Sequence, residues 1–123
     1  MEYRYYTADA EKKREILEKL RGLLAARGVR LAVVFGSFVE LDSFRDIDVA
    51  IYIDGREELD ALLKLGADLE EELGIPVDVA PLRELHPKFR LKVLTRGVVI
   101  VEEPGLYEAL LLQALDELEL LNR

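Results

Sequence analysis

Two short apolar runs, joined by a polar segment, limit the folds that this chain of 123 residues can adopt. The first run covers residues 31–35 and ends at Gly36 and Ser37, and the second covers residues 47–53 and follows Asp46. Runs of this length, rich in Val and Ile, are typical of buried β-strands. A sheet of such strands needs helices on its faces, and the flanking segments can supply them.

The segments around these runs place their apolar residues at helical spacing. Residues 9–27 repeat Ile and Leu among charged residues and stop before Gly28, and residues 56–73 show the same pattern before Gly74. Glycine after an amphipathic stretch is a common helix end, because it adopts the left-handed backbone that closes the last turn. A third helix is predicted over residues 83–95, broken early by a proline.

The remaining pattern completes an alternating order of helices and strands. Apolar runs at residues 76–81 and 97–101 predict two further strands, and residues 105–121 predict a C-terminal apolar helix. This alternation indicates an α/β fold, with a mixed β-sheet of about four strands flanked by helices. We expect a single domain, residues 1–123, because a chain of this length buries about two-thirds of its unfolded surface in one core.

Charge and composition argue against several classes of protein. The net charge is -8 and there is no cysteine, which makes long nucleic acid an unlikely ligand and removes disulfides and zinc–thiolate sites. No apolar run approaches the length of about 20 residues that spans a bilayer, and the first residues lack the apolar stretch of a secretory signal. We therefore expect a cytoplasmic protein that does not enter the membrane.

The balance of residue types is also typical of proteins from hot habitats. One Met, one Gln and one Asn stand beside abundant Glu, Lys, Arg and Leu. A thermophilic source is therefore a hypothesis, and cooperative melting of the purified protein below about 60 °C would contradict it.

Acidic residues interrupt two of the predicted strands. Asp46 and Asp48 flank Ile47, so both carboxylates point to one face of the strand. Two carboxylates about 4 Å apart repel by roughly 4 kcal/mol at an effective dielectric near 20. Asp78, in the run 76–81, supplies a third carboxylate. Mg2+ suits such an all-oxygen site, and three carboxylates can hold two ions about 3.5–4 Å apart. The ordinary alternative is a solvated strand start or turn pair, which the Gly-Ser turn disfavours.

The order of these features resembles a known family. The succession of strand, Gly36-Ser37 turn, polar loop, Asp46-x-Asp48 strand, helix and Asp78 strand is similar to the signature of the nucleotidyltransferase superfamily related to DNA polymerase beta. The short chain is similar to the minimal nucleotidyltransferase branch of that superfamily. The resemblance covers most of the chain and implies a nucleotidyltransferase-like mixed sheet whose ligands bind beyond the strand ends.

The resemblance also implies roles for single residues. In that family the counterparts of Asp46, Asp48 and Asp78 hold Mg2+, expected here as two ions, and those of Gly36 and Ser37 hold a nucleoside triphosphate, expected here to be ATP. The implied reaction transfers a nucleotidyl group, AMP, to a hydroxyl and releases pyrophosphate. Asp78 is expected to help activate that hydroxyl.

One loop position departs from the family pattern. Glu40 stands where Arg is usual, and we expect Arg45, directly before Asp46, to supply positive charge to the nucleotide instead. The basic segment 86–92 is predicted to be a solvated helix face rather than a phosphate-binding patch, and its His86 a surface residue.

The C-terminal helix carries more leucine than a surface helix needs. Its apolar surface is wider than a single stripe, so the helix either packs deeply in its own domain or exposes an apolar face to another chain. We expect such exposure, with a second copy or a different protein as the partner. Minimal nucleotidyltransferases are commonly encoded with a helical HEPN-type ribonuclease toxin and act as its antitoxin, so the resemblance implies such a partner. The leucines of this helix are Leu106, Leu110, Leu111, Leu112, Leu115, Leu118, Leu120 and Leu121.

Three functions are compatible with this sequence. The first is an antitoxin enzyme that adenylylates a HEPN-type toxin partner. The second is a catalytically weak or inactive binding antitoxin that neutralises its partner by forming a complex. The third is a nucleotidyltransferase for small molecules, for which 123 residues leave little room for a separate acceptor domain.

Overall fold

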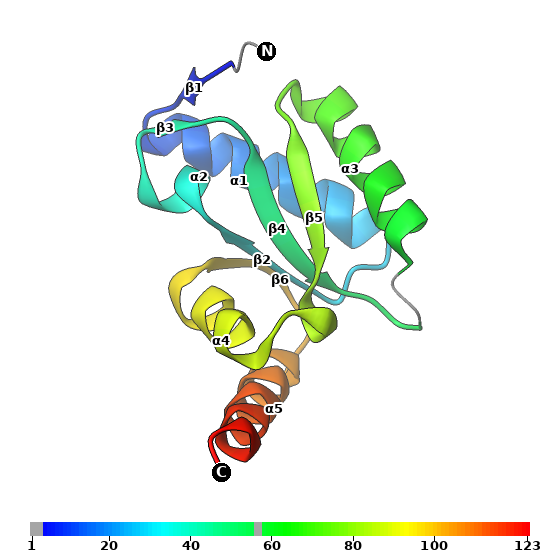
Figure 1. The fold of residues 1–123 in the computed structure, drawn as a ribbon. Coiled ribbons are helices and arrows are strands. Elements are labelled where there is room, and N and C mark those ends of the chain that lie inside the picture. Colours follow the sequence, from blue (N-terminus) through cyan, green and yellow to red (C-terminus); the bar gives the residue numbers. More distant parts are fainter. Residues whose placement is uncertain (1–3, 56–57) are drawn as a thin grey trace.

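A four-stranded mixed sheet lies at the centre of the molecule (Figure 1), in a computed structural model that describes residues 4–55 and 58–123. The strands run in the order β5-β4-β2-β6. β4 and β5 are parallel, whereas β2 is antiparallel to both β4 and β6. The predicted mixed sheet is confirmed, and its strands are β2 (Leu31–Phe35), β4 (Ile47–Tyr52), β5 (Val77–Pro81) and β6 (Val98–Glu102).

Helices cover both faces of this sheet. α1 and α3 pack against side chains such as Val34 and Val49, whereas α4 and α5 pack against Val33 and Ala50. Successive residues of a strand point to opposite faces, so each central strand contributes to two cores. The first residues predicted for α3, 56 and 57, lie outside the described part of the chain. The long helices are α1 (Ala10–Ala26), α3 (Leu59–Leu73), α4 (Pro87–Arg96) and α5 (Leu106–Leu121).

Two short strands lie beside this core, outside the four strands of the predicted sheet. β1 (Tyr6–Thr7) pairs in antiparallel fashion with β3 (Ser43–Phe44). The buried ring of Phe44 lies edge-on to Phe38, with ring centroids 4.8 Å apart, and stacks on Tyr6 at 6.0 Å. Strands of two residues are too short to show a period in the sequence. The aromatic contacts between these distant segments hold the two-stranded ribbon of β1 and β3 in place.

The break predicted at Pro87 proves to be a helix start. A 3-10 turn, Leu82–Glu84, precedes it, and α4 begins at Pro87, whose fixed φ suits the first helical position. The His86 side chain caps α4 by accepting a hydrogen bond from the amide of Lys88. The short α2 (Ser37–Glu40) follows β2 directly. Among the described helices, none combines the length and the apolar character that crossing a membrane requires.

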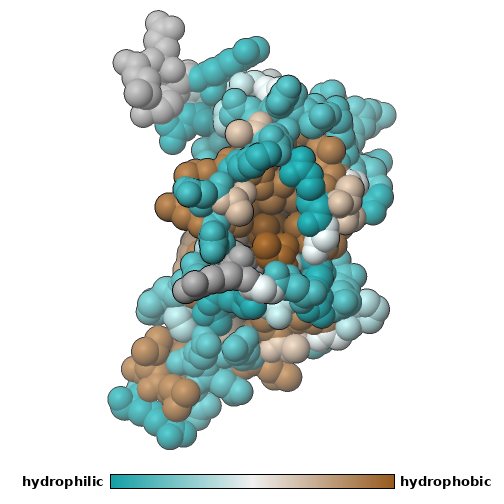
Figure 2. All heavy atoms as spheres, turned by 90° about the vertical axis from the view of Figure 1, so that its right-hand side faces the viewer, coloured by the Kyte–Doolittle hydropathy of each residue, from teal (hydrophilic) through white to brown (hydrophobic). Residues whose placement is uncertain are grey.

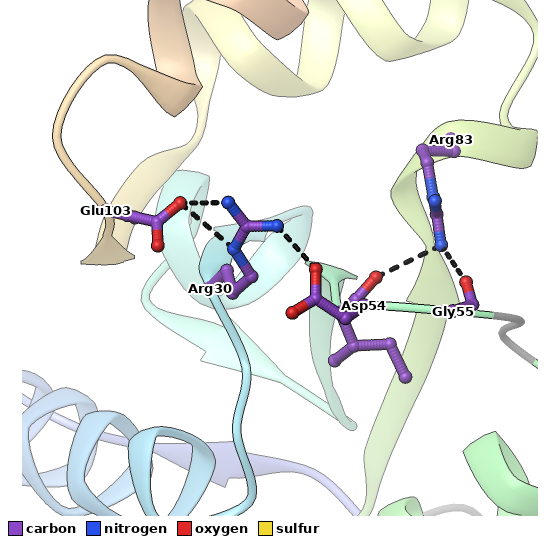
Figure 3. A network of polar contacts seen from close by, with 6 residues as sticks. Arg30, Asp54, Gly55, Arg83 and Glu103 are labelled. Carbon is purple, nitrogen blue, oxygen red and sulfur yellow. Dashed lines mark hydrogen bonds and ion pairs between the residues drawn. The ribbon is translucent and has the colours of Figure 1, made fainter.

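Two arginines join strands and loops at the end of the sheet where β2 begins (Figure 3). Arg30 donates hydrogen bonds to the carboxylates of Asp54 and Glu103, and Arg83 donates to the carbonyl oxygen of Gly55. These contacts connect the ends of β4 and β6 to each other and to the 3-10 turn. The acidic residues of the sequence signature lie at the opposite end of the sheet, where β4 and β5 begin.

Candidate functional site

The parallel pairing of β4 and β5 brings the three predicted carboxylates together. Asp48 is in register with Asp78, and Asp46 precedes Asp48 by two positions, so all three side chains leave the sheet on one face. One carboxylate oxygen of each residue lies within 4.8 Å of the others. Asp46 and Asp48 are half-buried while Asp78 is exposed, so a cation can reach the cluster from the β5 side.

Burial and mutual repulsion disfavour the charged form of this acidic cluster. Burial, followed by the charges of Asp46 and Asp78, raises the pKa of Asp48 to about 6. Burial and Asp78 likewise raise the pKa of Asp46, and the charge of Arg45 opposes that shift. A divalent cation offsets the penalty, because it pairs with the carboxylates and favours their charged forms. Mg2+ is the cation that best suits hard oxygen ligands arranged beside a phosphate.

Gly36, between β2 and α2, leaves room for the Asp48 carboxylate. Its φ is +79°, a backbone conformation that residues with a side chain rarely adopt. A Cβ at this position would lie only 2.4 Å from Oδ2 of Asp48. Glycine is therefore required both for the turn and for the close approach of the backbone to the acidic cluster. The resemblance implies a role for this glycine in holding the triphosphate, and the structure adds its close approach to Asp48.

A pocket with a cavity volume of about 190 Å3 adjoins Gly36 and Asp48. Its walls come from β2, α2, β4 and α4. The volume is below the roughly 300–1,000 Å3 typical of small-molecule sites, so a ligand as large as a nucleotide would extend beyond it. The lining residues are Phe35, Gly36, Val39, Glu40, Asp48, Phe89, Lys92, Val93 and Arg96.

Two cationic side chains of α4 line the same pocket as Asp48. Lys92 and Arg96 are exposed and form no ion pair within the described residues. The sequence predicts a solvated face for this part of the chain, and neither residue is among the predicted site residues. Their spacing of four residues puts both on one side of a helix, but this sequence signal does not distinguish a pocket wall from a solvated helix face. Carboxylates beside unpaired cations can bind a metal ion together with a polyanion such as a polyphosphate.

Two of the three predicted nucleotide-binding residues do not line this pocket. Ser37 follows Gly36 as the first residue of α2 and is half-buried. Arg45 is exposed directly before Asp46. Neither is among the residues that line the pocket, so their nucleotide-binding roles stay predictions. Glu40 does line the pocket, where α4 supplies the positive charge.

Comparison with known sequences identifies the family of this chain. A sequence model of the family described as Polymerase beta, Nucleotidyltransferase matches residues 18–104. A candidate protein adenylyltransferase of Methanocaldococcus jannaschii is 34% identical over 90 residues, which represent 71% of this chain and 96% of that protein. The family match includes all three residues of the acidic cluster, which lie well inside residues 18–104.

Solved structures share the fold. One chain of a toxin–antitoxin complex with AMP-PNP has a TM-score of 0.76 at 23% identity, covering 85% of this chain and 88% of that chain. A structure of a tri-AMPylated Shewanella oneidensis HEPN toxin with an MNT antitoxin contains a chain with a TM-score of 0.75 at 22% identity, covering 89% and 88%. The sequence matches, the shared fold and the geometry of the acidic cluster all agree with a nucleotidyltransferase. The chain therefore belongs to the polymerase beta nucleotidyltransferase family, as a nucleotidyltransferase-like enzyme of the minimal type.

Proposed function

We propose that this protein is a Mg2+-dependent nucleotidyltransferase that transfers AMP from ATP to a hydroxyl of a HEPN-type toxin and so acts as its antitoxin. The proposal rests above all on the meeting of Asp46, Asp48 and Asp78 beside the pocket that Lys92 and Arg96 line. The carboxylates bind the cation, and the two basic side chains bind phosphates of the same ligand. A metal site alone would not need the two basic side chains, and a phosphate site alone would not need the three carboxylates.

The acidic cluster has the donor set that Mg2+ prefers. Asp46 and Asp48 would hold one ion, and Asp78, whose carboxylate lies within 4.8 Å of theirs, would help to hold a second. When bound, Mg2+ neutralises charge on the triphosphate and on the departing pyrophosphate. Gly36 keeps the Asp48 carboxylate in position for this role because no side chain intervenes.

The nucleotide enters the pocket between α2 and α4. Arg96 can form paired hydrogen bonds with phosphate oxygens, and Lys92 contributes a point charge. Phe35 and Phe89 contact each other edge to face, with ring centroids 5.7 Å apart, and Phe89 keeps 41% of its surface exposed. An exposed ring at the wall of the pocket is a platform on which an adenine base can stack.

The reaction is an in-line displacement at the α-phosphorus. The acceptor oxygen forms a bond to this phosphorus, and the bond from the phosphorus to the oxygen that bridges to the β-phosphate breaks. Pyrophosphate leaves with the electron pair. The proton of the hydroxyl passes to Asp78, which is the exposed member of the cluster and therefore accessible to an acceptor from solvent.

α5 offers an apolar surface for the toxin. Its exposed leucines include Leu112, Leu115 and Leu120, and Figure 2 shows apolar atoms at the lower end of the molecule, where α5 lies. A protein with the same fold forms a complex with a HEPN toxin, and the relative from Methanocaldococcus jannaschii is a candidate protein adenylyltransferase. These two likenesses support a protein acceptor and an adenylyl group.

Transfer of label from ATP tests the proposal. Incubation with Mg2+, α-labelled ATP and a HEPN-type toxin should label the toxin with the wild-type protein. Asp46→Asn removes a ligand of the cation and is expected to abolish labelling. Asp42→Asn, the same change at an exposed residue outside the cluster, should leave labelling at the wild-type level.

A different outcome would favour the second candidate function. If the wild type and Asp46→Asn both bind the toxin and neither labels it, the protein is a binding antitoxin on a nucleotidyltransferase fold. One observation favours this alternative: Glu40 places a negative charge in the pocket, close to the expected path of the triphosphate.

A further inference from the structure

The outer edge of β5 has unused backbone groups. β5 is the last strand on its side of the sheet, and the amide of Ile47 in β4 donates to the carbonyl oxygen of Pro76. Because the backbone groups of successive residues alternate in direction, Asp78 also bonds toward β4, whereas Val77 and Val79 direct their groups away from it. In the part of the chain that the structure describes, no hydrogen bond uses these outward groups.

A groove runs between this edge and α3. Gly66 of α3 packs against Val77 so closely that a Cβ on Gly66 would stand 2.7 Å from the Val77 carbonyl oxygen, so the edge is covered there. Beside this contact the groove has a volume of about 290 Å3, with Leu63, Ala67 and Glu70 on its α3 wall. Leu63 is 64% exposed, and Figure 2 shows apolar atoms between hydrophilic ones on this side of the molecule. The contact of Gly66 with Val79 is looser, because the same Cβ would lie 3.8 Å from Cγ2 of Val79, and Val79 lines the groove.

The groove and the acidic cluster share Asp78. This residue lines the groove and also belongs to the cluster. The side chains of Val77 and Val79 point to the α3 face, while that of Asp78 points to the opposite face, beside Asp48. A strand added next to β5 would therefore direct alternate side chains into the groove and toward the cluster.

We propose that this edge is the docking site for the acceptor. An extended segment of the acceptor protein pairs with the outward backbone groups of Val79, places an apolar side chain against Leu63 and Ala67, and brings the hydroxyl of the adjacent residue to Asp78. This inference rests on the proposed function and adds where its acceptor binds. The nucleotide pocket lies on the β2 side of β4 and the groove on the β5 side, so the two substrates approach the carboxylates from different directions.

The charge of the groove defines the chemistry of the docking segment. Glu70 lines it and none of the described residues that line it is basic, while Asp78 directs its carboxylate to the opposite face, where the acidic cluster lies. Complementary charge therefore favours Lys or Arg two residues from the hydroxyl residue, on the face of the segment that meets the acidic cluster. Main-chain hydrogen bonds to an open strand edge select an extended segment, and the groove selects apolar side chains at alternate positions.

Amide hydrogen exchange tests the docking site without catalysis. The probe is the acetylated and amidated peptide Lys-Leu-Tyr-Leu-Lys at millimolar concentration, which alternates apolar side chains with a hydroxyl and basic groups. We expect it to slow exchange of the Val79 amide about tenfold. Ala67→Arg fills the groove and should remove this protection, whereas Ala61→Arg, the same change at an exposed residue of α3 outside the groove, should keep it. Unchanged exchange in the wild type, or equal protection in both variants, would overturn the proposal.

Transfer kinetics separate this proposal from the proposed function. With a HEPN-type toxin as acceptor, Ala67→Arg is expected to raise KM for the toxin about tenfold and to leave kcat and the affinity for ATP with Mg2+ unchanged. If Ala67→Arg has the same KM for the toxin as the wild type, the proposed docking site is wrong, and the proposed function is unaffected. If neither the wild type nor any variant labels the toxin, but the peptide still protects the Val79 amide from exchange, the proposed function is wrong and the docking site is unaffected.

Discussion

At the residue scale, two glycines share a backbone angle but differ in their surroundings. Gly36 and Gly28 both have φ of +79°, yet a Cβ would meet Asp48 at Gly36 and open space at Gly28. Alanine at either position is expected to lower the free energy of unfolding by about 1–2 kcal/mol through backbone strain. Only Gly36→Ala also pushes the Asp48 carboxylate away from Asp46 and Asp78. It should therefore weaken Mg2+ binding about tenfold in a calorimetric titration.

Gly28→Ala is the matched control for that titration. It carries the same strain without a contact to Asp48, so its Mg2+ affinity should equal that of the wild type. Equal affinities for Gly28→Ala and Gly36→Ala would show that the close approach at Gly36 does not position the carboxylate.

Asp48 also makes stability depend on pH. Its pKa of about 6 lies above the ordinary value of 3.8 that applies to the unfolded chain. The folded state therefore binds this proton more tightly, and the metal-free protein loses stability as pH rises from about 4 through about 6. Asp48→Asn removes this loss. We expect it to stabilise the metal-free protein at pH 7.5 by about 1 kcal/mol, after allowance for partial exposure, and to change little at pH 4.

Urea denaturation with a chelator at the two pH values measures this effect. Saturating Mg2+ should reverse the sign of the stability difference between Asp48→Asn and the wild type at pH 7.5, because the ion stabilises the folded wild type through the carboxylate that the variant lacks. A gain of equal size at both pH values would contradict the role of the Asp48 charge.

The residues of the site were predictable to different degrees. Asp46, Asp48 and Gly36 could be found from the sequence, because a Gly-Ser turn and a strand that begins with two carboxylates are local patterns. Lys92 and Arg96 could not, because a basic helix face looks the same whether it meets water or a pocket. Only the packing of α4 against the sheet distinguishes the two cases.

At the element scale, Arg90 ties α4 to α5 from a buried position. Its guanidinium pairs with Glu117 of α5 and donates to the carbonyl oxygens of Arg83 and Leu85. Arg90→Met keeps much of the volume but leaves these oxygens without their donor, so it should lower the free energy of unfolding by about 2–4 kcal/mol in urea denaturation. Arg96→Met, the same change on the exposed side of α4, should cost less than about 0.5 kcal/mol. Similar costs would show that the buried pair does not hold the helices together.

The elements themselves followed from sequence wherever their pattern was long enough. α1 and α5 have helical spacing and β2 is a continuous apolar run, and all three elements end within one residue of the predicted bounds. β1 and β3 are not among the predicted strands of the sheet, because each has two residues and is stabilised by aromatic rings that come together only in the fold. Pro87 was correctly read as an interruption, but the helix starts at it because proline is favourable at a first helical position.

At the scale of the whole molecule, α5 should decide which chain this protein binds. Leu112 and Leu115 are 62% and 44% exposed, so replacing both with Asp removes apolar surface without opening the core. We expect the complex with a HEPN-type toxin to weaken at least about tenfold, measured by calorimetry, because exposed apolar patches of this kind mark interfaces. The melting temperature should change by less than about 4 °C.

Leu41→Asp is the control for this surface. Leu41 is 58% exposed and lies outside α5, so the variant should bind the toxin as the wild type does. If the double variant also binds normally, α5 is not the toxin surface. Loss of a wild-type dimer in gel filtration would instead assign the surface to a second copy of the chain.

The sequence by itself determined the order of helices and strands, the resemblance to nucleotidyltransferases and the three carboxylates, because these depend on spacing along the chain. Tertiary structure decided that β4 and β5 are parallel and in register, which brings Asp48 and Asp78 together. It also decided that α4 lines the pocket and that β5 keeps an open edge beside α3. Contacts between distant segments depend on how the helices pack on the sheet. The hydrophobic effect requires that an apolar face of the sheet or of a helix be buried, but it does not specify which polar side chains then meet at the edge of that buried surface.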